Sequence, residues 1–295
     1  MILTLEDAKR LAAQNSLNRP VGRPGRLSGK ITVITGAAQG FGKGLAELLH
    51  AEGARVVIAD LPSQHTAAQA LVAQLGADAV YCPVDVTQEE MVQALVCFTV
   101  AQFGGLDSFI ANAGILKAGA LSEMSAADFE MVTRVNYTGY FLCTKYAAEI
   151  MRAQSEANPD FWGDIVQINS KSGLEGSAKN SAYSGGKFGG IGLTQSLARE
   201  LAADQIKVNA VCPGNFYDGP LWSDPENGLF VQYLRAGKVP GAKTVAEVRE
   251  FYLAKSLIRR GCYPQDVARA VLYCVEQQFE TGQALPVTGG QNMLK

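Results

Sequence analysis

Short runs of β-branched residues alternate with longer amphipathic stretches from Ile31 almost to the end of the chain, and this alternation constrains the fold more than any other feature. The strand-like runs are Ile31–Thr35, Val56–Asp60, Ala79–Val84, Ser108–Ala111, Ile165–Asn169, Lys207–Cys212 and Ala284–Val287, and the helical stretches are Gly42–Ala51, Ser63–Leu75, Gln88–Phe103, Ala126–Met151, Ser181–Ala203 and Pro264–Gln277. Strands separated by helices pair in parallel, because each helical crossover returns the chain to the same edge. The pattern predicts a single α/β domain, with a doubly wound sheet of seven mainly parallel strands and helices on both faces.

Two regions fall outside this alternation. Residues 1–28 contain one amphipathic helix after Thr4, a candidate N-cap, and then a Pro/Gly-rich linker at 19–25. We expect an arm that packs on its own subunit or on a neighbour, followed by the main domain at 29–295. Residues 214–260 read as two short helices joined by Pro/Gly turns, which is long enough for a lid over a binding site. Substrate choice is expected to lie in this lid.

The composition favours a small-molecule substrate. The 295 residues are 47% hydrophobic and 18% charged, with a formal net charge of −2. No basic run could follow a phosphate backbone, so no nucleic acid partner is predicted. No apolar stretch reaches the roughly 18 residues that a membrane span needs. The N-terminus carries Glu6 and Asp7 and lacks a secretory cleavage pattern, so a cytoplasmic protein is expected.

Cysteine and histidine usage argues against metal chemistry. The six cysteines include no C-x-x-C pair, and several lie in apolar runs where a reduced thiol packs as a small hydrophobe. The two histidines, His50 and His65, are too few for a histidine-rich metal site. No metal site is predicted, and acid–base chemistry must use another residue type.

The first strand runs directly into a glycine-rich turn, Thr35-Gly36-Ala37-Ala38-Gln39-Gly40-Phe41-Gly42, after which a helix begins. Glycines there allow a tight turn and the close approach of a pyrophosphate to the helix N-terminus, as in Rossmann-like dinucleotide sites. An ordinary strand–helix turn is the alternative. A nucleoside triphosphate loop fits less well, because Gly44 follows Lys43 where a Ser or Thr should bind magnesium.

An acidic residue, Asp60, ends the second strand, about twenty residues after the glycines. A carboxylate there accepts hydrogen bonds from the adenosine ribose and repels a 2′-phosphate, and no basic residue follows it at 61–63. The sequence predicts NAD(H) over NADP(H), with a helix-capping Asp as the alternative. The predicted cofactor contacts are Gly36, Gln39, Gly40, Phe41, Gly42, Asp60, Leu61, Asp85, Val86, Asn112, Ala113, Gly114, Tyr183, Lys187, Pro213 and Gly214.

The predicted catalytic residues are Asn136, Ser170, Tyr183 and Lys187. Tyr183 and Lys187 are four residues apart in a predicted helix, so their side chains share a face. A phenol of pKa about 10 is a poor base at neutral pH, and a neighbouring ammonium would lower that pKa. Ser170 ends the fifth strand, where its hydroxyl can hydrogen-bond a substrate oxygen. Asn136, a poor helix former inside a predicted helix, is a candidate for a proton relay or a solvent-facing residue.

In order and spacing, these elements resemble the short-chain dehydrogenase/reductase family over residues 29–294. The resemblance rests on the glycine turn, Asp60, Asn112-Ala113-Gly114, Asn136, Ser170, Tyr183-x-x-x-Lys187 and Pro213-Gly214. It implies hydride transfer with a nicotinamide cofactor and Tyr183 as the general acid/base. It also implies that Lys187 tunes the tyrosine and holds the nicotinamide ribose, that Ser170 orients the substrate and that Asn136 completes the relay.

Longer stretches, such as 167–173, 187–197 and 287–291, resemble the bacterial sorbitol-6-phosphate 2-dehydrogenases. That resemblance implies interconversion of D-sorbitol 6-phosphate and D-fructose 6-phosphate. Basic residues on predicted loops near the substrate edge could hold the phosphate: Lys117, Lys171, Lys179, Arg259 and Arg260. The arm at 1–28 and an insertion at 222–243 depart from the resemblance, so another polyol, sugar or secondary alcohol stays open.

Two other function classes are alternatives. A dinucleotide-sensing regulator would keep the fold without the chemistry, and the intact Ser170, Tyr183 and Lys187 argue against it. A sugar-nucleotide epimerase would use the same Tyr/Lys pair, but it would need a differently spaced glycine turn and a larger C-terminal domain.

Five glycines between residues 185 and 192 disfavour an isolated helix by about 1 kcal/mol each, so close helix packing must offset them. In the family this helix meets its counterpart in another subunit. The resemblance therefore implies a homodimer or homotetramer.

Overall fold

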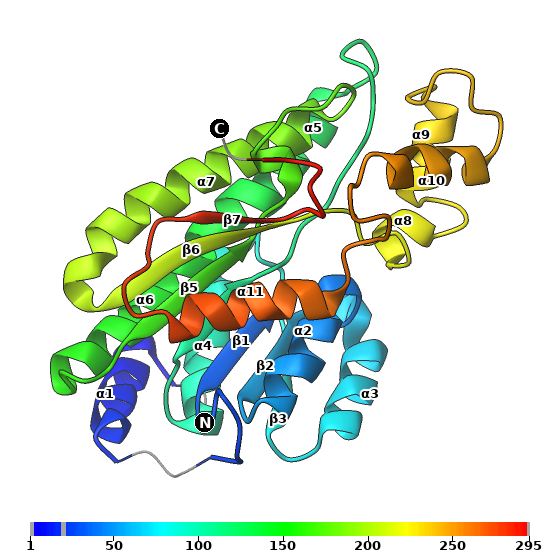
Figure 1. The fold of residues 1–295 in the computed structure, drawn as a ribbon. Helices are drawn as coiled ribbons and strands as arrows, with labels where there is room; N and C mark the ends of the chain where they lie inside the picture. The colour runs from blue at the N-terminus through cyan, green and yellow to red at the C-terminus, as the bar shows by residue number, and fades with distance from the viewer. Residues whose placement is uncertain (1–2, 19–21, 294–295) are drawn as a thin grey trace.

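The computed structural model describes residues 3–18 and 22–293; linker residues 19–21 lie outside the described residues. Within them, seven strands form one sheet in the order β3-β2-β1-β4-β5-β6-β7 (Figure 1). The strands are β1 (Ile31–Thr35), β2 (Arg55–Asp60), β3 (Ala79–Pro83), β4 (Ser108–Ala111), β5 (Gly163–Ile168), β6 (Ile206–Pro213) and β7 (Ala284–Val287). All neighbouring strands pair in parallel, which confirms the predicted Rossmann-like α/β fold.

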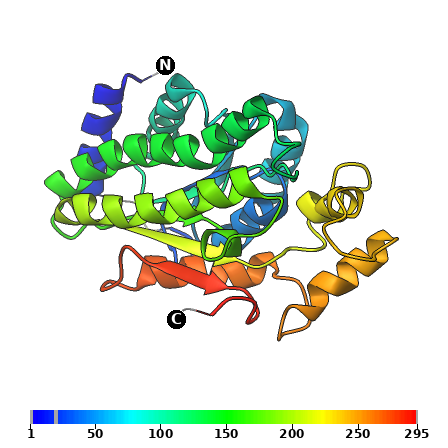
Figure 2. The same ribbon diagram turned by 90° about the horizontal axis from the view of Figure 1, so that it is seen from above.

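Helices cover both faces of the sheet because its central strands are apolar on both faces. One face carries α2 (Gly40–Ala51), α3 (His65–Leu75) and α11 (Pro264–Glu276), and the other carries α4 (Glu89–Phe103), α5 (Ala126–Thr133), α6 (Gly139–Ala157) and α7 (Ser181–Leu201) (Figures 1 and 2). Successive strand residues point to opposite faces. In β1, Val33 joins the hydrophobic cluster on the α4 and α6 side and Ile34 joins the cluster on the α2 and α11 side, and both are fully buried.

The N-terminal helix α1 (Leu5–Ser16) packs against α4 and α6 of its own chain. Its predicted N-cap is confirmed, because the Thr4 hydroxyl accepts a hydrogen bond from the Asp7 N–H at 3.2 Å. Ala8 and Ala12 are fully buried against the domain. None of the described helices is long and apolar enough to cross a membrane.

The topology opens a crevice at the carboxyl edge of the sheet. From β1 the chain proceeds to β2 and β3 on one side and then crosses back to β4 on the other side, so the loops after β1 and β4 separate there. Asn112 joins these two strand ends, since its Nδ2 donates to the Thr35 carbonyl at 2.8 Å and to the Gly36 carbonyl at 3.0 Å. This crevice positions the site.

One predicted helix, 126–151, is wrong in extent. It is divided into α5, a π-helical turn at Arg134–Thr138, and α6, which continues to Ala157. Within the turn, Asn136 is bonded in both directions to one residue of the loop after β4: its Oδ1 accepts from the Ile115 N–H and its Nδ2 donates to the Ile115 carbonyl, both at 2.8 Å. Because the chain widens at a π turn, the amide side chain reaches this backbone without leaving the helix.

The lid, residues 214–260, is described throughout and contains three short helices rather than the expected two. They are α8 (Pro220–Ser223), α9 (Leu229–Arg235) and α10 (Val245–Ala254). The lid has its own apolar cluster, separate from the two that flank the sheet, in which Trp222 packs against Tyr233 and Tyr252 with ring centroids 5.6 and 5.1 Å apart. Figure 2 shows these helices standing beyond one end of the sheet.

Candidate active site

A cavity of about 1140 Å³ lies between the carboxyl edge of the sheet and the lid. The predicted site residues that line it are Gly36, Gln39, Gly40, Phe41, Asp60, Leu61, Asp85, Val86, Asn112, Ala113, Gly114, Ser170, Tyr183, Lys187, Pro213 and Gly214. The fold does not place Gly42 and Asn136 on this wall. Asn136 instead lines a small adjoining void together with Lys187.

The glycine turn forms a cradle that a side chain would fill. Gly36 and Gly40 adopt φ angles of +63° and +58°, which favour glycine. A Cβ on Gly42 would lie 2.1 Å from the Gly36 carbonyl oxygen, so only glycine lets α2 begin this close to β1. The N-cap residue Gln39 makes no side-chain cap hydrogen bond, which leaves the first N–H groups of α2 for an anionic ligand.

Asp60 closes the far side of this cradle. The side chain is buried, and its Oδ2 accepts from the Ala38 N–H while its Oδ1 accepts from the Leu61 N–H, both at 2.8 Å. The carboxylate therefore ties the end of β2 to the glycine turn and also lines the cavity. Backbone N–H groups for a pyrophosphate and a carboxylate for ribose hydroxyls fit a nicotinamide dinucleotide.

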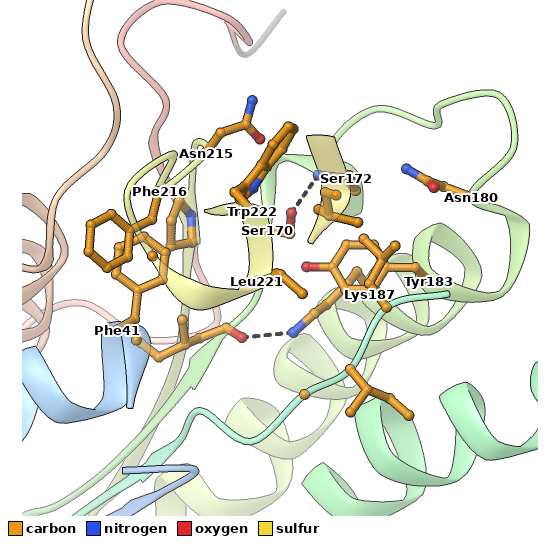
Figure 3. A pocket seen from close by; sticks show the side chains of 18 of the residues that line it. Phe41, Ser170, Ser172, Asn180, Tyr183, Lys187, Asn215, Phe216, Leu221 and Trp222 are labelled. Atoms are coloured by element: carbon orange, nitrogen blue, oxygen red, sulfur yellow. Dashed lines mark hydrogen bonds between the residues drawn. The ribbon is translucent and has the colours of Figure 1, made fainter. Parts of the chain in front are cut away.

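Tyr183 and Lys187 lie in the first two turns of α7 and face the cavity beside Ser170, which follows β5 (Figure 3). The Lys187 Nζ donates to the Ile168 carbonyl at 2.9 Å and lies 5.7 Å from the centroid of the Tyr183 ring. The helix is fixed against β5 by Asn169, whose Nδ2 donates to the Lys187 carbonyl at 2.9 Å. Strand and helix thus hold the two hydroxyls and the ammonium as one group.

Burial controls the protonation of this group. Burial raises the pKa of Tyr183, whereas its hydrogen bond with Ser170 lowers that pKa. The sequence predicts a lowered pKa for Tyr183, but the Lys187 ammonium is directed to the Ile168 carbonyl, so the burial of the phenol dominates. Burial also lowers the pKa of Lys187 to about 8. A phenol in this state holds its proton at neutral pH and can donate it to a developing oxyanion.

Ser170 supplies the second hydroxyl of the site. It is buried, and its Oγ accepts a hydrogen bond from the Ser172 N–H at 3.1 Å, which fixes the oxygen at the end of β5 (Figure 3). The hydroxyl proton is left to donate to a substrate oxygen. Two hydroxyls next to one cavity can bind a carbonyl oxygen and stabilise the charge that develops on it.

The sequence predicts that the lid governs substrate choice, but it does not indicate which lid residues line the cavity. They include five aromatic and two basic residues: Phe216, Trp222, Tyr233, Phe251, Tyr252, Lys238 and Lys255. The density of aromatic residues between 216 and 252 was a signal for a packed cluster. The two lysines carried no such signal, because lysines in a loop are ordinarily solvated.

Among the five basic residues predicted to hold a phosphate, all of them described, Lys171 alone lines the cavity. Lys117 pairs with Asp128, Arg260 pairs with Asp266, and Lys179 donates to the Ala236 carbonyl. Arg259 is exposed outside the cavity wall. Lys117, Arg260 and Lys179 are therefore engaged by other parts of the protein. The prediction that they and Arg259 hold the substrate phosphate is not supported.

The chain matches the short chain dehydrogenase family profile over residues 30–224. Sorbitol-6-phosphate 2-dehydrogenase from Escherichia coli (strain K12) is 37% identical over 270 residues, which cover 90% of this chain and 99% of that enzyme. Cis-4-hydroxycyclohexanecarboxylate dehydrogenase from Sinomonas cyclohexanicum is 36% identical over 264 residues, which cover 88% and 96%. The crystal structure of sorbitol-6-phosphate 2-dehydrogenase from Erwinia amylovora superposes with a TM-score of 0.80 at 36% identity, over 89% of this chain and 100% of that one.

These matches agree with the site built from the residues. The matched profile contains the glycine turn, Ser170, Tyr183 and Lys187, and the relatives at 36–37% identity are named as dehydrogenases. The chain therefore belongs to the short-chain dehydrogenase/reductase family, and it is a nicotinamide-dependent oxidoreductase that acts on a CH–OH group of a small molecule.

Proposed function

We propose that this enzyme interconverts D-sorbitol 6-phosphate and D-fructose 6-phosphate with NAD(H). The observation that carries the proposal is the likeness to sorbitol-6-phosphate 2-dehydrogenase, which extends over 99% of the Escherichia coli enzyme and includes the lid. A solved relative with the same name is matched along its whole length. Relatives whose names give other substrates are also matched over 96–97% of their length, so the proposal rests on the 37% identity to the Escherichia coli enzyme and on the solved relative with the same name.

NAD(H) is proposed over NADP(H) because of Asp60. Its buried carboxylate lies on the cavity wall beside Leu61, and a 2′-phosphate there would meet a negative charge. The basic residues on the wall, Lys171, Lys187, Lys238 and Lys255, belong to the catalytic edge and the lid. When bound, the nicotinamide ring accepts or supplies the hydride.

The side chains of the enzyme bind and polarise the substrate and move its proton. Ser170 donates a hydrogen bond to the reacting oxygen of the ketose, and the buried Tyr183 phenol delivers a proton to the same oxygen as charge develops there. In the oxidation direction, the phenolate of Tyr183 takes that proton back. Lys187 favours the phenolate through its charge, and Asn136 positions the loop at Ile115 beside Lys187.

A different secondary alcohol is the second candidate. Cis-4-hydroxycyclohexanecarboxylate dehydrogenase is almost as similar, at 36% identity over 96% of its length. Its name describes a cyclic substrate with a carboxylate in place of a phosphate. An anionic substrate is common to both candidates, so the anion is what an experiment must vary.

We further propose a cytoplasmic homo-oligomer. All six cysteines are described, free and buried, which suits a reducing compartment. Exposed apolar side chains on α5, α6 and α7 support association between subunits.

The test is a substrate panel under NADH oxidation. We expect D-fructose 6-phosphate to give a higher kcat/KM than D-fructose or 4-oxocyclohexanecarboxylate, and NADH to be preferred to NADPH. Tyr183→Phe should lower kcat by roughly 10²–10⁴-fold while NADH fluorescence titration shows unchanged binding. A higher kcat/KM for the cyclic keto acid would reject the proposed substrate, and full activity of the Tyr183→Phe variant would reject the mechanism.

A further inference from the structure

Three lysines converge on the lid end of the cavity. Lys171 follows Ser170 at the edge of the sheet, Lys238 lies between α9 and α10, and Lys255 is the C-cap of α10. All three line the cavity wall. The site mechanism given above uses none of them.

Two stacked tyrosine rings organise the three ammonium groups. Tyr233 and Tyr252 stack with ring centroids 5.4 Å apart and an interplanar angle of 29°. The Lys238 Nζ lies 4.0 Å from the Tyr233 centroid, and the Nζ atoms of Lys171 and Lys255 lie 5.9 and 5.2 Å from the Tyr252 centroid. Ring faces attract cations, so the stacked pair, together with Phe251, whose ring centroid lies 4.3 Å from the Lys255 Nζ, favours lysines from the sheet edge and the lid on one side of the cavity.

Neutral side chains hold two of these ammonium groups in place. The Lys171 Nζ donates to the Gln291 Oε1 at 2.8 Å. The Lys238 Nζ donates to the Asn180 side-chain oxygen at 2.9 Å, in the orientation that satisfies all partners of that amide. Hydrogen bonds to neutral oxygens position an ammonium without cancelling its charge. The charge is therefore available to a ligand.

The cluster carries excess positive charge. The lysine ion pairs among the described residues belong to other lysines: Lys9, Lys43, Lys117, Lys145 and Lys207. Four acids line the cavity, of which Asp60 ends β2 and Asp85 follows β3 in the cofactor half. The other two are directed to neutral donors, Asp224 to the N–H groups of Glu226 and Asn227 and Glu175 to the Asn292 amide, so three ammonium groups outnumber two carboxylates. Burial lowers the pKa of Lys171 to about 8, with a further lowering by Lys255 that Glu175 opposes. Burial lowers the pKa of Lys238 to about 8, and Lys171 and Lys255 lower it further.

We propose that Lys171, Lys238 and Lys255 form the phosphoryl-binding site of this enzyme. A dianionic phosphoryl group offers three strong acceptor oxygens, which match three ammonium donors, and its charge relieves their mutual repulsion. This assignment rests on the proposed function, because it supplies the group that distinguishes a ketose phosphate from a ketose. Of the five basic residues that the sequence suggested for the phosphate, Lys171 alone belongs to this site.

The site lies at the right end of the cavity for such a substrate. Lys171 directly follows Ser170, which binds the reacting oxygen, and Tyr183, Tyr233 and Tyr252 all line the same cavity. A ligand can therefore run from the Tyr183 hydroxyl along Tyr233 to the lysines. Because Lys171 belongs to the sheet edge while Lys238 and Lys255 belong to the lid, the phosphoryl group joins the two parts.

The first experiment compares lysine variants on phosphorylated and unphosphorylated substrates. Lys238→Met and Lys255→Met should each raise KM for D-fructose 6-phosphate about tenfold or more, with kcat within about twofold of wild type. The kcat/KM for D-fructose should not change, and Lys238→Arg should recover most of the KM effect. The matched control is Lys243→Met, which removes an exposed lid lysine outside the cavity wall.

Inorganic phosphate provides a readout without turnover. It should raise the Tm of the wild type and compete with D-fructose 6-phosphate, and both effects should be lost in the Lys238→Met/Lys255→Met double variant but kept in Lys243→Met. If phosphate stabilises only proteins with an intact cluster although D-fructose 6-phosphate is not turned over, the site stands and the proposed substrate fails. If the wild type reduces D-fructose 6-phosphate and the double variant keeps its KM and its phosphate response, the site is overturned. A cluster that recognises the cyclic keto acid and ignores phosphate also overturns it.

Discussion

If Tyr183 is the acid/base, as proposed, its protonation sets the direction in which pH changes the rate. Burial raises the pKa of this phenol, so it carries its proton at neutral pH. In the proposed mechanism, reduction of the ketose needs the phenol and oxidation of the polyol needs the phenolate. We expect the oxidation rate to rise between about pH 7 and 9, by up to about tenfold per unit, while the reduction rate stays level or falls. The oxidation rate should rise most steeply with pH below pH 8. In that range Lys187 keeps its charge, because the pKa of Lys187 is lowered to about 8.

Measurements of kcat in both directions over this pH range check the prediction. Substrate must be saturating at every pH, so that changes in binding do not enter the profile. An oxidation rate that falls as the pH rises would contradict the acid/base role of Tyr183.

Asp60 has two tasks that substitution can separate. Its carboxylate accepts the Ala38 N–H at 2.8 Å and so holds the glycine turn, and we propose that its charge disfavours a 2′-phosphate. Asp60→Asn keeps an acceptor for that N–H and removes the charge, whereas Asp60→Ala removes both. We expect both variants to raise the ratio of kcat/KM for NADPH to that for NADH about tenfold, and Asp60→Ala alone to lower the Tm as well. A wild type that prefers NADPH would refute the assignment.

At the scale of elements, the layers around the sheet were predictable because each carries its own apolar period. Both faces of β1 are covered by helices, so Val33 and Ile34, which point to opposite faces, are both apolar. A short window of sequence is enough to show this pattern. The π turn was not predictable, because it depends on the contact between Asn136 and Ile115, 21 residues away. The helix α8 has four residues, about one turn, which is too short to show an apolar period in the sequence.

The same contrast explains which site residues were predictable. The residues of the cofactor half follow strand ends, and strand ends meet at one edge of a parallel sheet by geometry alone. Lys238 and Lys255 reach the cavity only through the packing of Tyr233 and Tyr252 in the lid. Tertiary packing of this kind leaves no local pattern in the sequence.

The glycines of α7 divide into two groups. A Cβ on Gly190 would lie 2.6 Å from the Gln167 amide nitrogen, and one on Gly189 would lie 2.8 Å from the Tyr137 ring. The close packing predicted from these glycines is therefore present within the chain at both positions. At Gly185 and Gly192, apart from the backbone of α7 itself and the adjoining residues, no atom of the described residues lies within 4 Å of such an atom. Those two positions are open to contacts from outside the chain.

At the scale of the whole molecule, large apolar side chains are exposed on α5, α6 and α7. Phe129, Met131, Phe141 and Phe188 on these helices are 44%, 51%, 43% and 46% exposed. We predict a dimer or tetramer by light scattering, and we expect Phe188→Glu to shift the population toward the monomer. Leu17→Glu, at an exposed leucine beside α1, is the control and should leave the oligomer intact. A wild-type monomer at micromolar concentration would exclude this interface.

The lid has a hydrophobic cluster of its own, apart from the two clusters that flank the sheet. The lid touches the glycine turn through Phe216, whose ring centroid lies 5.1 Å from that of Phe41, so we expect a mutation that reshapes Trp222 but keeps this contact to leave the two sheet clusters intact. Selection can then act on substrate preference without disturbing the machinery of hydride transfer. For protein engineering, residues 216–255 form a segment to exchange between relatives as a unit. Relatives that share this sheet can differ in substrate while they use the same coenzyme.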